Sequence, residues 1–374
     1  MNHKYLAEFS TADGYLNFAS VGPPSRAALS AAEGVMEAVA EAGESVVGII
    51  TPAYERGRAT IARALGVPGA RATSVPSTSA GIMQVAFGLL GAGGNLVVPA
   101  HEFPANLYPW LRAEAVGGPE VRAVEIPDRR VTAEALSPAI DGETRIVAFS
   151  LVDYMSGFRA DVEEIAGAAG DALVLVDGIQ GLGAVAAELG PADVFVAGGQ
   201  KWLRAGLSGG VMAVSERALE RLAPTLTGWF GVEDNFAFEV PPPHGALPTA
   251  ERFLESSPNV LGAVTSAAAL EVVEIAGIEH VEAAVLERSG AVLEIARGLG
   301  AEVIAPWRSD RERAGIVTLR LAGVDAASAV TRLGEGGIVV SERNGWIRVS
   351  PHATTPLSAI ERLGEALAAQ PRNA

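Results

Sequence analysis

Short apolar runs alternate with helical patterns along most of the 374-residue chain. The runs are rich in β-branched residues and end abruptly in glycine or a polar residue, which is typical of buried parallel strands. Strands are predicted at residues 95–99, 121–126, 145–150, 174–177 and 194–198, with a returning strand at 209–214. Helical segments separate these strands. The pattern therefore predicts an α/β fold, a mainly parallel sheet with helices on both faces.

The pattern changes at both ends of this central region. Residues 1–22 form a predicted N-terminal arm that ends in Gly-Pro-Pro, residues 25–66 have a helical pattern, and residues 72–81 are predicted to be a loop. Residues 259–286 have the pattern of one long helix or two consecutive helices. Beyond them, strands are predicted at 316–321, 338–340 and 346–350, and helices at 326–333 and 356–369. These elements predict an arm (1–22), a large domain (23–258) and a small α+β domain (259–374) near which the arm packs.

The ends of two central strands carry the candidate chemistry. Asp177 ends one strand and Lys201 follows the next, and ligands in open α/β sheets bind beyond the carboxyl ends of strands. Only Lys4 and Lys201 among the 28 basic residues are lysines. A lysine amine can lose its proton and form a Schiff base, whereas an arginine cannot, so a lysine kept at this position indicates that chemistry. The alternatives are a surface lysine and an aspartate that only caps a helix.

Residues Ser77-Thr78-Ser79 precede a helical pattern and offer hydroxyls and backbone N–H groups to a phosphate. The alternative is a helix cap without a ligand. No Gly-Lys-Ser/Thr motif occurs, and no GxGxxG follows a strand, which argues against a P-loop and a nicotinamide site. A phosphate cradle, a strand-end aspartate and an isolated lysine together match the needs of pyridoxal phosphate, since the carboxylate can hold a protonated pyridine nitrogen.

Composition excludes several other classes of function. A net charge of −16 argues against a nucleic-acid partner, whose phosphates this surface would repel. No apolar segment indicates a membrane, so a cytoplasmic location is predicted. The histidines lack ligand spacing, and no metal site is predicted. The chain contains no cysteine, which excludes disulfides and a thiol nucleophile.

These motifs resemble the class V aminotransferase group of fold-type I pyridoxal phosphate enzymes over nearly the full length. That group includes cysteine desulfurases, kynureninases, isopenicillin N epimerase-like proteins and C–S lyases. Asp177-Gly-Ile-Gln180 is similar to the group's Asp-x-x-Gln/His, which implies that Asp177 meets the pyridine nitrogen and Gln180 the ring hydroxyl. Gly198-Gly-Gln-Lys201 is similar to the Schiff-base segment. Many members have Ser-x-His-Lys there, so Gly198 removes one phosphate ligand and Gln200 alters another.

The resemblance implies further site residues. Phe103, in Glu102-Phe-Pro-Ala-Asn106, would stack on the ring, and Arg348 would clamp the substrate α-carboxylate. Ser256 or Ser257 would donate a phosphate ligand across the interface of a homodimer. The implied cofactor-binding residues are Ser77, Thr78, Ser79, Phe103, Asp177, Gln180, Gln200, Lys201, Ser256 and Ser257. The implied substrate-binding residues are Arg348, Asn17, Ser20 and Tyr154.

The resemblance implies an enzyme that acts on an α-amino acid through a Schiff base and a Cα carbanion, with Lys201 and Asp177 as catalytic residues. Residues 200–206, 227–231 and 241–243 are most similar to C–S lyases, which favours β-elimination from a cysteine-derived substrate. Without a cysteine, the chain cannot store sulfur as a protein persulfide. An aminotransferase and an amino-acid epimerase remain alternatives, as does a non-catalytic binding protein that kept the fold.

Overall fold

The computed structural model describes residues 2–43, 45–186, 189–207, 209–239, 241 and 243–371, and its centre is a seven-stranded sheet. The strand order is β1-β7-β6-β5-β4-β2-β3. Strand β7 is antiparallel to both neighbours, and the other pairings are parallel. The predicted mainly parallel α/β sheet is therefore confirmed. The bounds are β1 Ala72–Val75, β2 Asn95–Pro99, β3 Glu120–Val124, β4 Thr144–Ser150, β5 Leu173–Asp177, β6 Val194–Gly198 and β7 Gly210–Val214.

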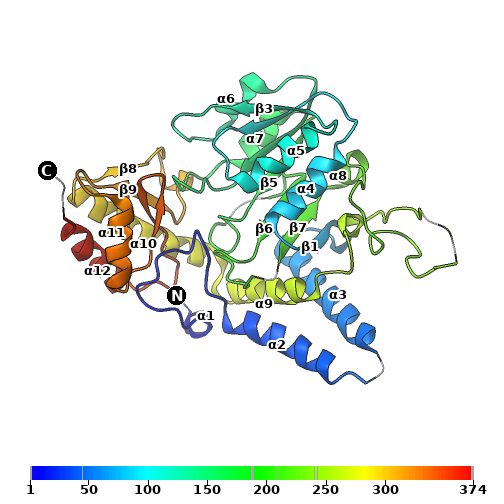
Figure 1. The fold of residues 1–374 in the computed structure, drawn as a ribbon, viewed down its shortest axis with the longest axis horizontal. Coiled ribbons are helices and arrows are strands. Elements are labelled where there is room, and N and C mark those ends of the chain that lie inside the picture. The colour runs from blue at the N-terminus through cyan, green and yellow to red at the C-terminus, as the bar shows by residue number, and fades with distance from the viewer. Residues whose placement is uncertain are drawn as a thin grey trace.

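Helices cover both faces of this sheet (Figure 1). Successive residues of a strand point to opposite faces, so Val97 joins the core beneath one helical layer while Leu96 and Val98 join the other. One layer holds α4 (Thr78–Gly88), α5 (Tyr108–Glu114) and α8 (Glu216–Arg221). The opposite layer holds α3 (Val46–Ala64), α7 (Val162–Ala169) and α9 (Val260–Ala276), with α6 (Ala133–Leu136) beside them. Burial on both faces explains why the inner strands β5, β6 and β7 are almost entirely apolar, whereas the edge strands β1 and β3 carry polar residues.

The C-terminal region forms a second, smaller unit around an antiparallel sheet in the order β10-β11-β9-β8. Its core joins this sheet to two helices and part of a third. The elements are α10 (Ile278–Gly298), β8 (Glu302–Val303), β9 (Val317–Arg320), α11 (Ala326–Glu335), β10 (Ser341–Arg343), β11 (Trp346–Val349) and α12 (Leu357–Ala368). No single helix of the described residues has the length and apolar composition to cross a bilayer, although α9 and α10 meet that test jointly across an 82° bend.

The N-terminal arm lies between the two units. It contains α1 (His3–Ala7) and leads into α2 (Arg26–Ala40), which packs against α9. Phe18 N–H donates to Ser350 O at 3.1 Å, and Gly22 N–H donates to Gln200 O at 2.8 Å. The arm thus connects the small unit to the loop that carries Lys201. The boundary at residue 259 remains a prediction, and α9 packs with α2 and α3 under the large sheet.

Two element predictions are wrong in detail, and a third is refined by the structure. Residues 72–75 form β1 rather than a loop, because Thr73 and Ser74 are buried at the edge where β1 pairs with β7. The helical segment 25–66 is two helices, α2 and α3, and the second begins after the Ser45 cap. The strand expected at 338–340 begins only at Ser341, since Val339 instead bridges to Tyr15 of the arm. Short 3₁₀ helices, which the patterns did not indicate, lie at Gly69–Arg71, Pro104–Asn106, Ser137–Ala139, Ala250–Phe253 and Asp310–Glu312.

Candidate active site

The predicted chemistry gathers at the carboxyl edge of the large sheet. Asp177 is the last residue of β5 and pairs in register with Ser150, the last residue of β4. Lys201 follows β6, Phe103 follows β2, and Thr78 begins α4 directly after β1. Parallel strands bring these ends to one edge. Asp177 is 1% exposed and Lys201 9% exposed, so both ionisable groups are buried.

Asp177 is a buried carboxylate without a fixed cation. Its Oδ1 accepts a hydrogen bond from Ile179 N–H at 2.9 Å, and no basic side chain in the described ranges lies within ion-pair distance of it. Burial raises the pKa of Asp177 to about 6, against the opposing effects of the Ile179 hydrogen bond and the charge of Lys201. This carboxylate is suited to a cationic N–H group brought by a ligand.

The Lys201 amine lies 5.3 Å from the centre of the Phe103 ring. Burial lowers its pKa to about 8, Asp177 partly opposes the shift, and Arg348 and Arg343 add to it. A large fraction of this amine is therefore neutral at slightly alkaline pH, which a nucleophilic amine requires. The backbone of the lysine loop is closely covered by the arm. A Cβ atom on Gly22 would lie 2.0 Å from Lys201 O, so only glycine fits there.

The predicted phosphate loop interlocks with the lysine loop. Ser77 Oγ caps α4 by accepting from Ala80 N–H at 3.1 Å, and Thr78 Oγ1 accepts from Gly198 N–H at 2.8 Å. The Ser79 side chain at the same helix start is half-buried. The Gln200 side chain folds over Gly198, where an added Cβ would lie 2.3 Å from Gln200 Oε1. A helix N-terminus with hydroxyl groups is a suitable anion site.

The two residues expected at the ring differ in their surroundings. Phe103 is 41% exposed and packs edge to face on Tyr154, with ring centres 5.3 Å apart, so part of the ring is accessible to a ligand. The Gln180 amide instead has two protein partners. It donates to Ala19 O at 3.0 Å and accepts from Trp202 Nε1 at 2.8 Å. Gln180 thus ties the arm to the lysine loop, and its contact with a ring hydroxyl remains a prediction.

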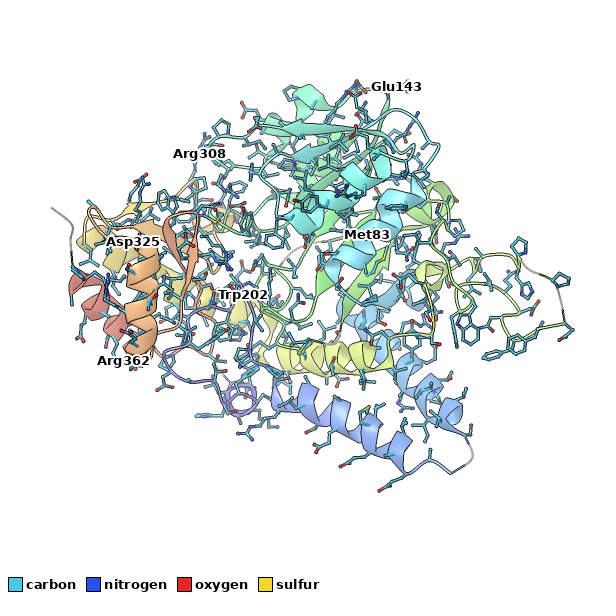
Figure 2. All side chains as sticks on the ribbon, in the orientation of Figure 1. Met83, Glu143, Trp202, Arg308, Asp325 and Arg362 are labelled. Carbon is cyan, nitrogen blue, oxygen red and sulfur yellow. The ribbon has the colours of Figure 1, made fainter. Side chains whose placement is uncertain are left out.

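Arg348 brings the predicted substrate residues together. Its guanidinium is 2% exposed and donates to Tyr154 O at 2.9 Å and to Ser20 Oγ at 2.8 Å. Ser20 Oγ in turn donates to Asn17 Oδ1 at 2.8 Å. Burial and, to a smaller extent, the charge of Arg343 lower the pKa of Arg348 to about 10. Figure 2 shows Trp202, next to Lys201, in the region where the large sheet meets the small unit.

Ser256 and Ser257 lie elsewhere on this chain. Both are exposed in the segment before α9, and no hydrogen bond in the described part of the chain joins them to Thr78 or Lys201. Their predicted role depends on a second copy.

Two residues near the site were not selected from the sequence. Glu102 is 8% exposed and accepts from Ser150 N–H at 2.6 Å and Ser150 Oγ at 2.5 Å. Burial raises its pKa to about 8, against the Ser150 side-chain hydrogen bond, and the nearby charge of Asp177 adds to the rise. Arg343 reaches Ser20 Oγ at 3.3 Å. The position of Glu102 directly before Phe103 could have identified it as a site residue from the sequence. Nothing in the sequence identifies Arg343 in this way, because its contact with the arm is purely tertiary.

The donor set fits pyridoxal phosphate. A buried amine of lowered pKa, a buried carboxylate without a counter-ion, an open aromatic face and a hydroxyl-bearing helix start share one edge of the sheet. These groups suit the cofactor's aldehyde, pyridine nitrogen, ring and phosphate, respectively.

Comparisons with known proteins agree with this assignment. The family model for Aminotransferase class-V matches residues 33–359. A probable cysteine desulfurase of Halalkalibacterium halodurans is 27% identical over 327 residues, which cover 83% of this chain and 75% of that protein. The isopenicillin N epimerase of Streptomyces clavuligerus is 29% identical over 249 residues, covering 63% of this chain and 53% of the relative.

Solved structures share the fold. The cystine C–S lyase C-DES, in complex with its reaction product cysteine persulfide, has a TM-score of 0.87 and 21% identity, covering 96% of this chain and 98% of that one. The apo cysteine desulfurase of Thermococcus onnurineus has a TM-score of 0.84 and 21% identity, covering 95% of this chain and 93% of that one. Because the family model spans most of the sequence, the chain belongs to the class-V aminotransferase family, whose cofactor is pyridoxal 5'-phosphate.

Proposed function

We propose that this pyridoxal phosphate enzyme is a C–S lyase that eliminates a sulfur substituent from the β-carbon of a cysteine-derived amino acid. The observation that carries the choice is the absence of cysteine from a chain related to cysteine desulfurases. A desulfurase that passes sulfur to a protein thiol needs a cysteine. Without one, the leaving group departs directly into solution, and the remaining aminoacrylate hydrolyses to pyruvate and ammonia.

The catalytic residues of this proposal are Lys201 and Asp177. Bound pyridoxal phosphate supplies the electron sink that stabilises negative charge at the substrate Cα. Lys201 would hold the cofactor covalently until the substrate amino group replaces it in that link. The released amine would then accept the Cα proton, because burial lowers its pKa to about 8 and makes the neutral form available. Asp177 holds the proton on the pyridine nitrogen. Its free carboxylate needs no competing ion pair to be broken first.

The substrate is held by residues around Arg348. The guanidinium binds the α-carboxylate through two parallel N–H groups, and Ser20 and Asn17 fix it from the arm side. Phe103 stacks on the ring, with Tyr154 packed against its edge. Ser77, Thr78 and Ser79 would hold the phosphate at the start of α4, with Gln200 beside them. Fixing the ring and the carboxylate together would hold the Cα–H bond in the orientation that selects it for cleavage.

The proposed assembly is a homodimer. An aromatic loop carries Trp229, Phe236 and Phe238, with exposed fractions of 44%, 55% and 79%, and its rings contact one another in sequence. Such a large exposed apolar group is typical of a protein interface. Gly228 N–H donates to Leu254 O at 2.8 Å, so this loop adjoins the segment of Ser256 and Ser257. A second copy that covers the loop would receive these serines at its phosphate site.

The test of reaction type uses S-substituted cysteines with and without a 2-oxo acid acceptor. Elimination gives pyruvate, ammonia and the free thiol in the absence of the acceptor. An aminated acceptor without pyruvate would establish transamination instead. Loss of optical rotation without either product would establish an epimerase. Sedimentation of the active holoenzyme as a monomer would contradict the dimer.

A further inference from the structure

Two arginines, rather than one, meet the arm at the mouth of the site. Arg348 lies on β11 and Arg343 on β10 of the small unit, and the two strands pair as a hairpin. Both guanidinium groups donate to the same oxygen, Ser20 Oγ, at 2.8 Å from Arg348 and 3.3 Å from Arg343. Arg348 is deeply buried, whereas Arg343 is partly exposed, so Arg343 is the outer member of the pair.

The pair has spare hydrogen-bonding capacity. Each guanidinium offers five N–H donors. Arg348 uses three of them, on Ser341 Oγ, Tyr154 O and Ser20 Oγ, and Arg343 uses two, on Glu342 O and Ser20 Oγ. All four acceptors are neutral oxygens. Within the described ranges, neither arginine has a carboxylate at ion-pair distance, unlike Arg129 or Arg130 nearby.

Positive charge exceeds negative charge around this mouth. The charges of Arg348 and Arg343 lower the pKa of Lys201, and the charge of Arg343 lowers the pKa of Arg348; Asp177 is the carboxylate that faces Lys201. Asp153 also faces Arg348, but its two oxygens already accept from Arg129 at 2.9 and 2.6 Å. The Glu342 carboxylate accepts from Gly345 N–H. A single α-carboxylate would therefore balance only one of the two arginines.

We infer that the substrate carries a second carboxylate, and that Arg343 binds it while Arg348 binds the α-carboxylate. This inference rests on the proposed function and narrows its substrate class to cysteine derivatives whose sulfur substituent ends in a carboxylate. The division of roles follows from depth. The buried arginine takes the carboxylate next to the reacting carbon, and the outer arginine takes the distal one, where the substituent points to solvent.

Binding of unreactive acids to the holoenzyme tests this directly. Succinate, glutarate, adipate and pimelate are titrated by calorimetry, each against the monocarboxylate of the same chain length. We expect at least one dicarboxylate to bind roughly ten- to hundredfold more tightly than its monocarboxylate, the range of a charge-assisted hydrogen bond. In Arg343→Gln this ratio should fall to about one to two, the value left when a single charged site remains.

The matched control is Arg362→Gln, which removes the same charge from the same unit. Arg362 is exposed on α12, at the outer end of the small unit (Figure 2), and should leave the ratio unchanged. A wild-type ratio near one would overturn the inference. So would equal weakening of both acids by Arg343→Gln, because both arginines would then clamp one carboxylate. If the dicarboxylates bind as expected but no cysteine derivative is cleaved, the subsite stands and the proposed lyase reaction fails.

Discussion

The sheet edge and the substrate mouth are built in different ways. At the sheet edge, Asp177 is fixed by strand register, and the loop after β6 holds Lys201 beside it. At the mouth, Asn17 and Ser20 come from the arm, Tyr154 from a turn after β4, and Arg348 from the small unit. The cofactor chemistry therefore depends on one sheet, whereas substrate recognition depends on how three separate segments meet. Substrate specificity can change at the mouth without disturbing the sheet.

The largest effect is expected at the sheet edge. Lys201→Ala should lower turnover at least about a thousandfold, because the covalent link and the proton acceptor are both removed. The thermal transition of its apoprotein should stay near that of the wild-type apoprotein, since Lys201 forms no ion pair among the described residues. Lys4→Ala is the matched control, because Lys4 is the other lysine of the chain and lies in the arm. Steady-state rates of the two variants measure this effect. A fully active Lys201→Ala would show that Lys201 is not the catalytic lysine.

Asp177→Asn should cause the second-largest fall in turnover. The amide oxygen can still accept from Ile179 N–H, so the strand end should keep its geometry. Turnover should fall roughly a hundred- to thousandfold, because the carboxylate that keeps the pyridine nitrogen protonated, and so able to accept electron density, is lost. Rates measured at saturating cofactor separate this from weaker binding. Near-normal turnover would remove the carboxylate from the mechanism.

The mouth should respond in KM rather than in turnover. Arg348→Lys keeps the positive charge but loses the planar fork and the bonds to Tyr154 O and Ser20 Oγ. KM should rise roughly tenfold to a hundredfold, with a smaller change in kcat, since the carboxylate contact exists before and during bond breaking. A fall in kcat with constant KM would place Arg348 at the reacting atoms and would weaken the contrast between the two regions.

The smallest effect concerns stability at the boundary between the regions. Glu102 keeps its proton up to about pH 8 in the folded chain, because burial raises its pKa, but loses it near pH 4.5 when unfolded. The folded form binds the extra proton in this window, so the free energy of unfolding should decrease as pH rises through it. Glu102→Gln should reduce that decrease by up to roughly 5 kcal/mol, taking each pKa unit as about 1.4 kcal/mol.

Urea unfolding of the apoprotein near the two ends of this pH window measures the effect. Glu361→Gln is the control, because Glu361 is exposed on α12 and its replacement should leave the pH dependence unchanged. An identical pH dependence in wild type and Glu102→Gln would show that Glu102 is ionised throughout the window.

The difference between the regions also explains what the sequence could predict. Apolar runs and their abrupt ends predicted the central strands, because burial on both faces leaves a plain signal, and Asp177 and Lys201 were found by their place at those ends. Strand β1 was not predicted, because Thr73 and Ser74 give it the polar character of a loop. Arg343 was not identified as a site residue, because its position at Ser20 depends on packing of the arm against the small unit, over a separation of 323 residues.

The most direct test of the central claim is to map the covalent attachment of the cofactor. The holoenzyme is treated with borohydride, digested, and its peptides are identified by mass spectrometry. Because the chain has only two lysines, the result is unambiguous. We expect a reduced pyridoxyl group on the peptide that contains Lys201 and an unmodified Lys4. Attachment at Lys4, or a reduced and active holoenzyme with neither lysine modified, would contradict it.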